Sequence, residues 1–405
     1  MIYQVLHILF LALFIYLSVN VGYLLLISIT GLFARRKSSI ENINRKKIAV
    51  LITSYKEDDV IVNTIRQAVE HDYPKENFDV FLVADQLQPS TIEKIKTFDV
   101  HVSEVNFPVG SKARSLNFLL NKIDPAKYDI ALVLDGDNIM TPGFLEKINS
   151  AFQEGFKAVQ AHRTAKNRNT PVAVLDALSE EINNHLFRRA QRALGFSSSL
   201  IGSGMAFEFD TLKKVYNKPG ILDNPACDRE VDFEMMKNGI TVQYLDDAML
   251  LDEKVSSGNV FEKQRRRWLE SQMLHLKLFL SKNEHVTRKT KDYWNKLFIN
   301  LIPPRIIFLA IFFIIFLCCL AQYFLEIDIT GFAITWWIVL FAAYILSLII
   351  AVPSHLITLS TLKAFLYLPS VLFSYIKAAF TMKINRKEFV HTPKTYTGKT
   401  ESTEK

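Results

Sequence analysis

The sequence IALVLDGDN, residues 130–138, decides the fold of this chain. Its first five residues are apolar and predict a strand buried on both faces, which is typical of parallel sheets in α/β proteins. In such sheets, ligands bind beyond the carboxyl ends of the strands. Asp135 and Asp137 follow this strand directly and could approach one hard cation from the same side. Asp-Gly-Asp also occurs in ordinary turns, but the preceding buried strand favours a functional pair.

The residues before this strand alternate between short strands and amphipathic helices. The predicted strands are 48–53, 78–84 and 100–105, and the predicted helices are 59–71, 89–98 and 111–123. This alternation predicts a mostly parallel α/β sheet. Polar clusters end three of its strands, at Thr53 to Glu57, at Asp85-Gln86 and at Asp135 to Asn138. We therefore expect these clusters to converge at one edge of the sheet.

The apolar residues, 49% of the 405 in the chain, are spread unevenly. Residues 1–34 contain no Asp, Glu, Lys or Arg, and a basic run from Arg35 to Lys37 follows them. A signal peptide carries its charge before a shorter apolar stretch, so this pattern predicts an uncleaved anchor whose basic flank stays in the cytoplasm. The uncharged stretches 306–325 and 329–362 are also long enough to span a bilayer.

A last apolar stretch, 366–380, is interrupted by Pro369 and Lys377 and predicts an interfacial or re-entrant helix. The chain therefore divides into several predicted regions. They are a transmembrane anchor at 1–34, a basic linker at 35–45, an α/β domain at 46–258, amphipathic interface helices at 259–300, two transmembrane helices at 301–352, an interfacial or third membrane helix at 353–382 and a basic cytoplasmic tail at 383–405.

The net charge of +7 is concentrated next to the apolar segments, which favours contact with anionic lipid headgroups over nucleic-acid binding. The three cysteines form no CxxC pair, so the sequence has no zinc or redox motif of that kind and fits a reducing compartment. We expect an integral protein of the plasma (inner) membrane with its α/β domain in the cytoplasm. The sequence leaves the oligomeric state open.

Three further motifs carry charge on predicted helices. Lys112 and Arg114 begin one helix, where they could bind an anion or simply follow a serine N-cap. Asp228 lies in an acidic helix start that the helix dipole alone would explain, or it serves as a general base. The run QRRRW, from Gln264 to Trp268, lies in a long helix, where its arginines could face lipid headgroups and its tryptophan could anchor at the membrane interface.

Taken in order, these motifs resemble the signature of inverting family 2 glycosyltransferases, especially the membrane group that includes cellulose, chitin and hyaluronan synthases and ceramide glucosyltransferase. That signature is an Asp after the second strand, a DxD motif, a third Asp usually written TED, and Q(Q/R)xRW. The matching segments, which include two similar to the family's KxxALN and GSGMAF, are Asp85, KARSLN at 112–117, DGD at 135–137, GSGMAF at 202–207, Asp228 and QRRRW at 264–268. Two departures are that Cys227 replaces the usual Glu before Asp228, and that TSYKE at 53–57 lacks the common Pro and Asn.

The resemblance covers about residues 46–280 and implies a Rossmann-like GT-A fold. It also implies a nucleotide-sugar donor, with uridine as the nucleoside in most relatives. The residues implied to hold the nucleoside are Thr53, Tyr55, Glu57 and Asp85. Lys112 would lie near the phosphates, and Asp135 and Asp137 would serve a unit of Mg²⁺ or Mn²⁺ and diphosphate.

On the acceptor side, the resemblance implies that Asp228 deprotonates the incoming hydroxyl. The residues implied to contact the acceptor are Gly204, Gln264, Arg267 and Trp268. The expected reaction is one in-line displacement with inversion, so that an α-linked donor gives a β-linked product. A metal that neutralises the leaving diphosphate makes a general acid unnecessary.

The resemblance favours synthesis of an exopolysaccharide or cell-envelope glycan, and transfer of a single sugar to a lipid or lipid-linked acceptor is the alternative. FVHTPK at 389–394 resembles the FxVTxK segment of cellulose synthases, although no further membrane span follows it. A second alternative is an inactive, membrane-bound carbohydrate-binding scaffold, against which the intact aspartates argue.

Overall fold

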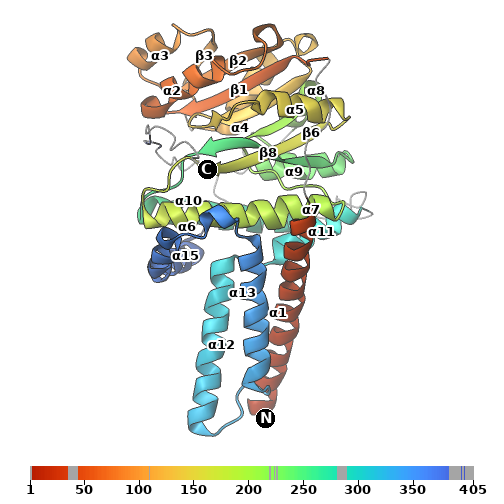
Figure 1. Cartoon of the computed structure of the whole chain (residues 1–405), viewed down its shortest axis with the longest axis vertical. Coiled ribbons are helices and arrows are strands. Elements are labelled where there is room, and N and C mark those ends of the chain that lie inside the picture. The colour runs from red at the N-terminus through yellow and green to blue at the C-terminus, as the bar shows by residue number, and fades with distance from the viewer. Residues whose placement is uncertain are drawn as a thin grey trace.

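The computed structural model describes residues 2–34, 44–108, 110–218, 220–222, 224, 227–280, 290–382, 394 and 396. Figure 1 shows a layered molecule with a sheet and its helices at one end and long apolar helices at the other. Helices α10 (Gly258–Phe279) and α6 (Pro171–Asn184) lie between these two layers. Most of the predicted basic linker and of the predicted tail lies outside the described residues.

The first half of the sheet is parallel, as the alternation of strands and helices predicts. Its strands, in spatial order, are β3 (His101–Val105), β2 (Phe78–Asp85), β1 (Ile48–Tyr55) and β4 (Ile130–Asp135). In register, Thr53 of β1 pairs with Asp135 of β4, and Tyr55 of β1 pairs with Asp85 of β2. The three polar clusters therefore meet at one edge of the sheet, as expected.

The second half of the sheet adds two reversed strands to a sheet that is mostly parallel, as predicted: six of the eight strands in the described residues run in one direction. Strand β7 (Met205–Glu208) is antiparallel to both β4 and β6 (Ala158–Ala165), and β6 is parallel to β8 (Val242–Asp252). The short β5 (Ile139–Met140) pairs antiparallel with β8. The segment between β6 and β7 turns towards the apolar helices instead of crossing over the sheet. Strands that are antiparallel neighbours need no crossover helix between them, so β7 can enter the sheet beside β4 in the reverse direction.

Two hydrophobic clusters cover the two faces of the sheet. Alternate residues of β1 enter different clusters, with Ile48 and Ile52 on one face and Ala49 and Leu51 on the other. The covering helices are α2 (Asp58–Val69), α3 (Pro89–Ile95) and α5 (Phe144–Gln153) on the first face, and α4 (Lys112–Lys122), α8 (Phe209–Tyr216) and α9 (Cys227–Lys237) on the second. Burial on both faces explains why these strands are apolar throughout.

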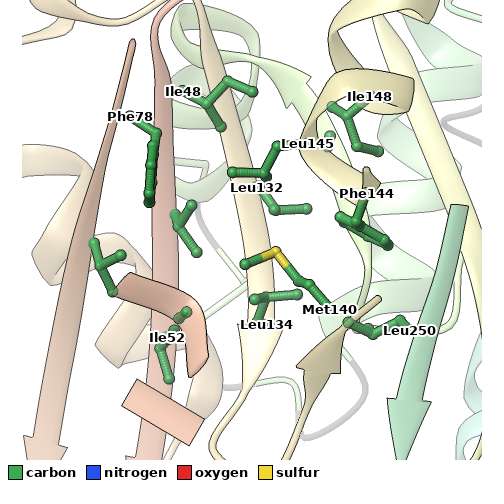
Figure 2. Packing of buried hydrophobic residues seen from close by; sticks show 14 of the residues in the cluster. Ile48, Ile52, Phe78, Leu132, Leu134, Met140, Phe144, Leu145, Ile148 and Leu250 are labelled. Atoms are coloured by element: carbon green, nitrogen blue, oxygen red, sulfur yellow. The ribbon is translucent and has the colours of Figure 1, made fainter. Parts of the chain in front are cut away.

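Figure 2 shows the first cluster, in which Leu132 and Leu134 of β4 pack beside Phe144 and Met140. Leu132 is fully buried, and truncation of such a side chain to alanine costs about 2–5 kcal/mol. This packing fixes β4, and with it the position of the DGD run at its end.

The apolar layer contains four helices whose length and composition would allow them to cross a membrane. They are α1 (Ile2–Phe33), α12 (Arg305–Leu325), α13 (Ile334–Ala351) and the stretch Leu359–Thr381, which comprises α14 (Leu359–Ala364) and α15 (Leu368–Thr381). The uncharged stretch 329–362 does not form one helix, since α13 ends just before Pro353, which cannot donate a backbone hydrogen bond. These helices are compatible with an integral membrane protein.

The layers are joined by polar contacts as well as by packing. A π-helical turn (His185–Arg189) connects α6 to α7 (Ala190–Ala193), and Nε2 of His185 lies 2.7 Å from the carbonyl oxygen of Ser28 in α1. Helix α11 (Lys291–Leu301) contacts α10, and α15 also packs on α10, where the rings of Phe261 and Tyr375 are 6.1 Å apart. Figure 1 places α15 beneath α10 instead of along α12 and α13.

Candidate active site

A chain of contacts joins the carboxylates that the sequence singles out. Lys112 is the first residue of α4, whose N-cap Ser111 accepts a hydrogen bond from the amide of Arg114. The Lys112 ammonium forms an ion pair with Asp135 and donates a hydrogen bond of 2.6 Å to the carbonyl of Gly202. A Cβ at Gly202 would lie 3.3 Å from Oδ2 of Asp228, so the Asp228 carboxylate lies against the same backbone. Asp135, through Lys112, and Asp228 therefore both lie next to Gly202.

Asp137, the second acid of the DGD run, is almost fully buried. Its Oδ2 accepts hydrogen bonds from the amide of Glu253 at 2.8 Å and from the ammonium of Lys394 at 3.1 Å. Burial opposes ionisation, but Lys394 and the Glu253 amide hold the pKa of Asp137 below its ordinary value. Its other oxygen, Oδ1, has no hydrogen-bond partner among the described residues.

These two aspartates fit the cation that the resemblance implies. The described part of the chain holds no group of three or more His, Cys, Asp or Glu side chains arranged as metal ligands. Mg²⁺ needs only one or two carboxylates when substrate oxygens complete its coordination. The unpartnered, buried Oδ1 of Asp137 is the kind of acceptor that such an ion would satisfy, with Asp135 beside it.

Glu57 lies beside the aspartate pair. Its carboxylate accepts a hydrogen bond from Ser54 and packs against Gly136, where any Cβ would overlap it. The central residue of the DGD run must therefore be glycine. Burial and the negative charge of Asp137 raise the pKa of Glu57 to about 8. Glu57 is therefore largely protonated near neutral pH, and its predicted contact with the nucleoside stays a prediction.

The other predicted nucleoside contacts lie in β1, which contains Thr53 and Tyr55, and at the end of the neighbouring β2, which contains Asp85. Oδ1 of Asp85 accepts a hydrogen bond of 3.2 Å from the amide of Phe107, while its buried Oδ2 has no partner in the described structure. Burial raises the pKa of Asp85. Tyr55 packs under Gly110, where a Cβ would lie 2.7 Å from its ring, and Thr53 is buried next to it in β1.

Helix α10 brings its QRRRW motif to the same site. The negative charges of Asp228 and Asp135 act on Arg267, although burial dominates and lowers its pKa. Oε1 of Gln264 has no partner within the described ranges. Arg265 is buried against Asp176 of α6, and its guanidinium lies 4.0 Å from the ring centroid of Trp268. The idea that the arginines of this motif merely face lipid headgroups is therefore wrong for Arg265.

Gly204, predicted to contact the acceptor, has a different role in the structure. Its amide donates to the carbonyl of Val133, and its carbonyl accepts from the amide of Ala161. It has a positive φ of +64° and is buried, and a Cβ would lie 2.9 Å from Leu250. The fold needs glycine here to join three strands, and the predicted contact of Gly204 with the acceptor stays a prediction.

Strand β8 contributes to the site in a way that was not predicted from the sequence. Asp252 ends this strand, and Glu253 follows it. Asp252 accepts a hydrogen bond from Asn138 at 3.2 Å, and Nζ of Lys166 lies 3.3 Å from the carbonyl of Asp137. The signal was present, since the apolar run AMLL at 248–251 is followed by Asp-Glu-Lys, much as the apolar run of β4 is followed by DGD. The contact of Lys394 with Asp137 was not predicted either.

The fold and these contacts define a GT-A glycosyltransferase fold with long apolar helices attached. The structure superposes on the mannosyltransferase PcManGT from Pyrobaculum calidifontis, solved in complex with GDP-Man and Mn²⁺, with a TM-score of 0.57 and 15% sequence identity. That match covers 93% of this chain and 98% of the other. The TarS fragment 1–349 from S. aureus, solved in complex with UDP-GlcNAc, matches with a TM-score of 0.42 and 14% identity over 83% of this chain and 91% of the other.

The chain belongs to the glycosyltransferase-like family 2, whose model matches residues 45–271. No curated protein matches the chain. The family match confirms the resemblance at the level of family 2, and the structural likeness confirms the GT-A fold.

Proposed function

We propose that this chain transfers a sugar, with inversion, from a nucleotide diphosphate sugar to a glycan acceptor at a membrane surface. One observation carries the proposal: Lys112 contacts both Asp135 and the backbone against which Asp228 lies. This contact supports a site in which Asp135 helps to bind the cation and Asp228 acts as the general base beside it. Such an arrangement suits attack on one face of a sugar while a charged group leaves from the other.

In this mechanism Asp135 and Asp137 would hold Mg²⁺ or Mn²⁺, and the ion would supply Lewis-acid stabilisation of the leaving diphosphate. Lys112 adds a positive charge on the same side, and Asp228 accepts the proton of the acceptor hydroxyl. Arg267 lies near both acids and stabilises negative charge that develops between them. The buried surroundings strengthen each of these interactions by excluding water.

The nucleoside is proposed to bind where Tyr55 and Asp85 end their strands. The unpartnered Oδ2 of Asp85 is a buried acceptor that a base or ribose donor would satisfy. Uridine is the first candidate because most relatives in the resembled group use it. PcManGT was solved with GDP-Man, so a guanosine donor belongs in any screen.

The acceptor is proposed to lie along α10. Gln264, Trp268, Ser271 and His275 are spaced by four, three and four residues and so share one face of this helix. Gln264, Ser271 and His275 each have a polar atom without a partner in the described residues. Eleven residues of helix span about 16 Å, which is room for an extended acceptor beyond one hydroxyl group. This face favours a glycan chain, free or lipid-linked, over a small acceptor.

The membrane arrangement follows from the position of Lys394. Its ammonium contacts Asp137, so residue 394 lies on the same side of the membrane as the sheet. Two crossings by α12 and α13 return the chain to that side, whereas a third crossing by Leu359–Thr381 would not. This supports an interfacial 353–382 segment, although its length and composition would allow a span. The basic residues near the spans favour a cytoplasmic sheet at the plasma membrane.

A screen of nucleotide sugars with the detergent-solubilised protein and Mn²⁺ or Mg²⁺ tests the proposal. We expect metal-dependent release of the nucleotide diphosphate with at least one donor, and its loss in Asp137→Asn. Asp210→Asn is the matched control, because Asp210 is an exposed aspartate at the opposite end of the strands. Failure of every donor to react would support the inactive-scaffold alternative instead. Product length in the presence of membranes separates polymer synthesis from single transfer to a lipid-linked acceptor.

A further inference from the structure

The carboxylate site around Asp137 already contains a cation from the chain itself. Nζ of Lys394 lies 3.1 Å from Oδ2 of Asp137, 3.7 Å from Oδ1 of Asp252 and 2.8 Å from the carbonyl oxygen of Glu253. Lys394 and Asp137 are 257 residues apart in the sequence, so this contact joins the C-terminal stretch to the end of β4.

The backbone next to Lys394 is attached as well. The amide of Tyr396 donates a hydrogen bond of 3.1 Å to the Glu253 carboxylate. Lys394 and Tyr396 are therefore both held by Glu253, which follows β8, so the lysine is not merely a long side chain that reaches the site from a distance. Docking of the stretch and occupation of the acidic site by its ammonium occur together.

A divalent cation at Asp137 is electrostatically incompatible with Lys394 at its present position. Oδ2 of Asp137 already accepts from the Glu253 amide and from Lys394, which leaves Oδ1 as its free acceptor. A divalent ion bound there would lie within a few ångströms of the ammonium, and like charges so close in a protein-enclosed site repel by several kcal/mol. The two cations would also share the same neutralising carboxylates. One of them must therefore leave.

We propose that Lys394 is the resident counter-ion of Asp137 in the metal-free protein, and that a divalent cation displaces it together with the stretch that carries Tyr396. The inference rests on the metal site of the proposed function and adds a competitor to it. It makes metal loading and release of the C-terminal stretch one linked equilibrium. Any condition that favours docking of this stretch then lowers metal affinity by the same factor.

The first test measures Mn²⁺ binding without donor, by electron paramagnetic resonance of free Mn²⁺, on the full-length protein. We expect Lys394→Gln to bind Mn²⁺ about tenfold more tightly than the wild type, which corresponds to about 1.4 kcal/mol of removed competition. Lys394→Arg keeps the positive charge and should bind like the wild type. Lys157→Gln is the matched control, because Lys157 is an exposed lysine paired with Glu208 at the opposite end of the strands.

The second test reads the position of the stretch itself by hydrogen exchange of a peptide that contains Tyr396. In the wild type, this amide should be protected without metal and lose protection when Mn²⁺ is added. Asp137→Asn should abolish the response to Mn²⁺. Equal Mn²⁺ affinity in the wild type and Lys394→Gln, with unchanged exchange, overturns the inference and leaves the proposed function intact. Absence of Mn²⁺ binding in every variant overturns both.

Discussion

Charged residues gather in two regions of this molecule, at the carboxyl edge of the sheet and in the layer between the sheet and the apolar helices. In the layer, buried charges satisfy one another, as when Arg163 bonds Glu180 at 2.6 Å and Arg189 holds Asp246 through two bonds of 2.7 and 2.8 Å. At the edge, Asp85 and Asp137 each keep a buried oxygen without a partner among the described residues. Arg188 and Arg265 of the layer also keep a buried Nε without a partner, but the unpartnered carboxylate oxygens of the described residues lie at the edge, in Asp85 and Asp137.

His162 shows how complete the pairing in the layer is. Its ring nitrogens lie 3.1 Å from a Glu181 oxygen and 3.0 Å from the Tyr244 hydroxyl. Burial disfavours the charged ring, but Glu181 and Asp246 raise the pKa of His162 to about 9. A buried histidine with a shifted pKa is a frequent sign of catalysis. Here both ring nitrogens contact a side chain of the fold, so a structural role explains the shifted pKa of His162.

The largest expected effect on activity comes from a substitution at the edge, Asp228→Asn. We expect transfer to fall by roughly 10²–10⁴-fold, because the acceptor hydroxyl loses its base, while donor binding stays nearly unchanged. Product formation and nucleotide affinity are measured on the same preparation. An equal loss of donor binding would show that Asp228 belongs to the donor side of the site.

In the layer, the largest expected effect is on stability. Asp176→Asn leaves the buried guanidinium of Arg265 without its counter-charge, which should lower the free energy of unfolding by about 3–5 kcal/mol. Replacing both partners, with Asp176→Leu and Arg265→Met, should restore most of this loss. Denaturant unfolding in detergent provides the measurement. If the double variant were as unstable as the single one, the two residues would contribute to stability through other contacts besides their ion pair.

The edge could be predicted from the sequence, because an apolar run followed by acidic residues is a pattern visible within a few consecutive residues. The change from IALVL to DGD marks both the end of β4 and the residues that face the site. The same holds for Asp85, at the end of β2. Asp228 required the resemblance, since an acidic helix start has an ordinary structural explanation.

The layer could not be predicted, because its residues are defined by distant partners. Arg265 and Asp176 are 89 residues apart. The helical period predicts which side of each helix is buried, but it does not predict which charged residue of another helix lies against that side. The antiparallel β7 was missed for a related reason, since its pairing with β4 depends on a return from the membrane side. The structural role of Gly204 was not predicted, because a motif does not tell a sheet glycine from a substrate contact.

A smaller effect at the edge should follow from Asp85→Asn. Loss of the charged acceptor should weaken nucleotide binding by roughly tenfold, as a hydrogen bond to a charged group is worth about 1.5–3 kcal/mol. Because burial raises the pKa of Asp85, replacing its carboxylate with the neutral asparagine side chain should change the free energy of unfolding little. Equilibrium binding of nucleotide diphosphates measures the effect, with the exposed Asp99→Asn as control. Unchanged affinity would remove Asp85 from the nucleoside site.

The smallest expected effect concerns His275, which lies where the two regions meet. Burial and the positive charge of Arg229 lower its pKa to about 3, so the folded protein keeps this ring neutral. The unfolded chain binds a proton below its ordinary value of 6.5, and stability from this residue is therefore lost as the pH falls from about 6.5 towards 3. The slope for one such group is at most about 1.4 kcal/mol per pH unit.

His275→Leu should remove this part of the slope. Its unpartnered Nε2 also means that the substitution costs little at neutral pH. Unfolding free energies of both proteins are compared between pH 7 and about 5, the range in which the histidine of the unfolded chain takes up its proton. A variant with the wild-type slope would show that His275 is protonated in the fold and has a partner. His275 would then resemble the paired residues of the layer and not the unsatisfied ones of the edge.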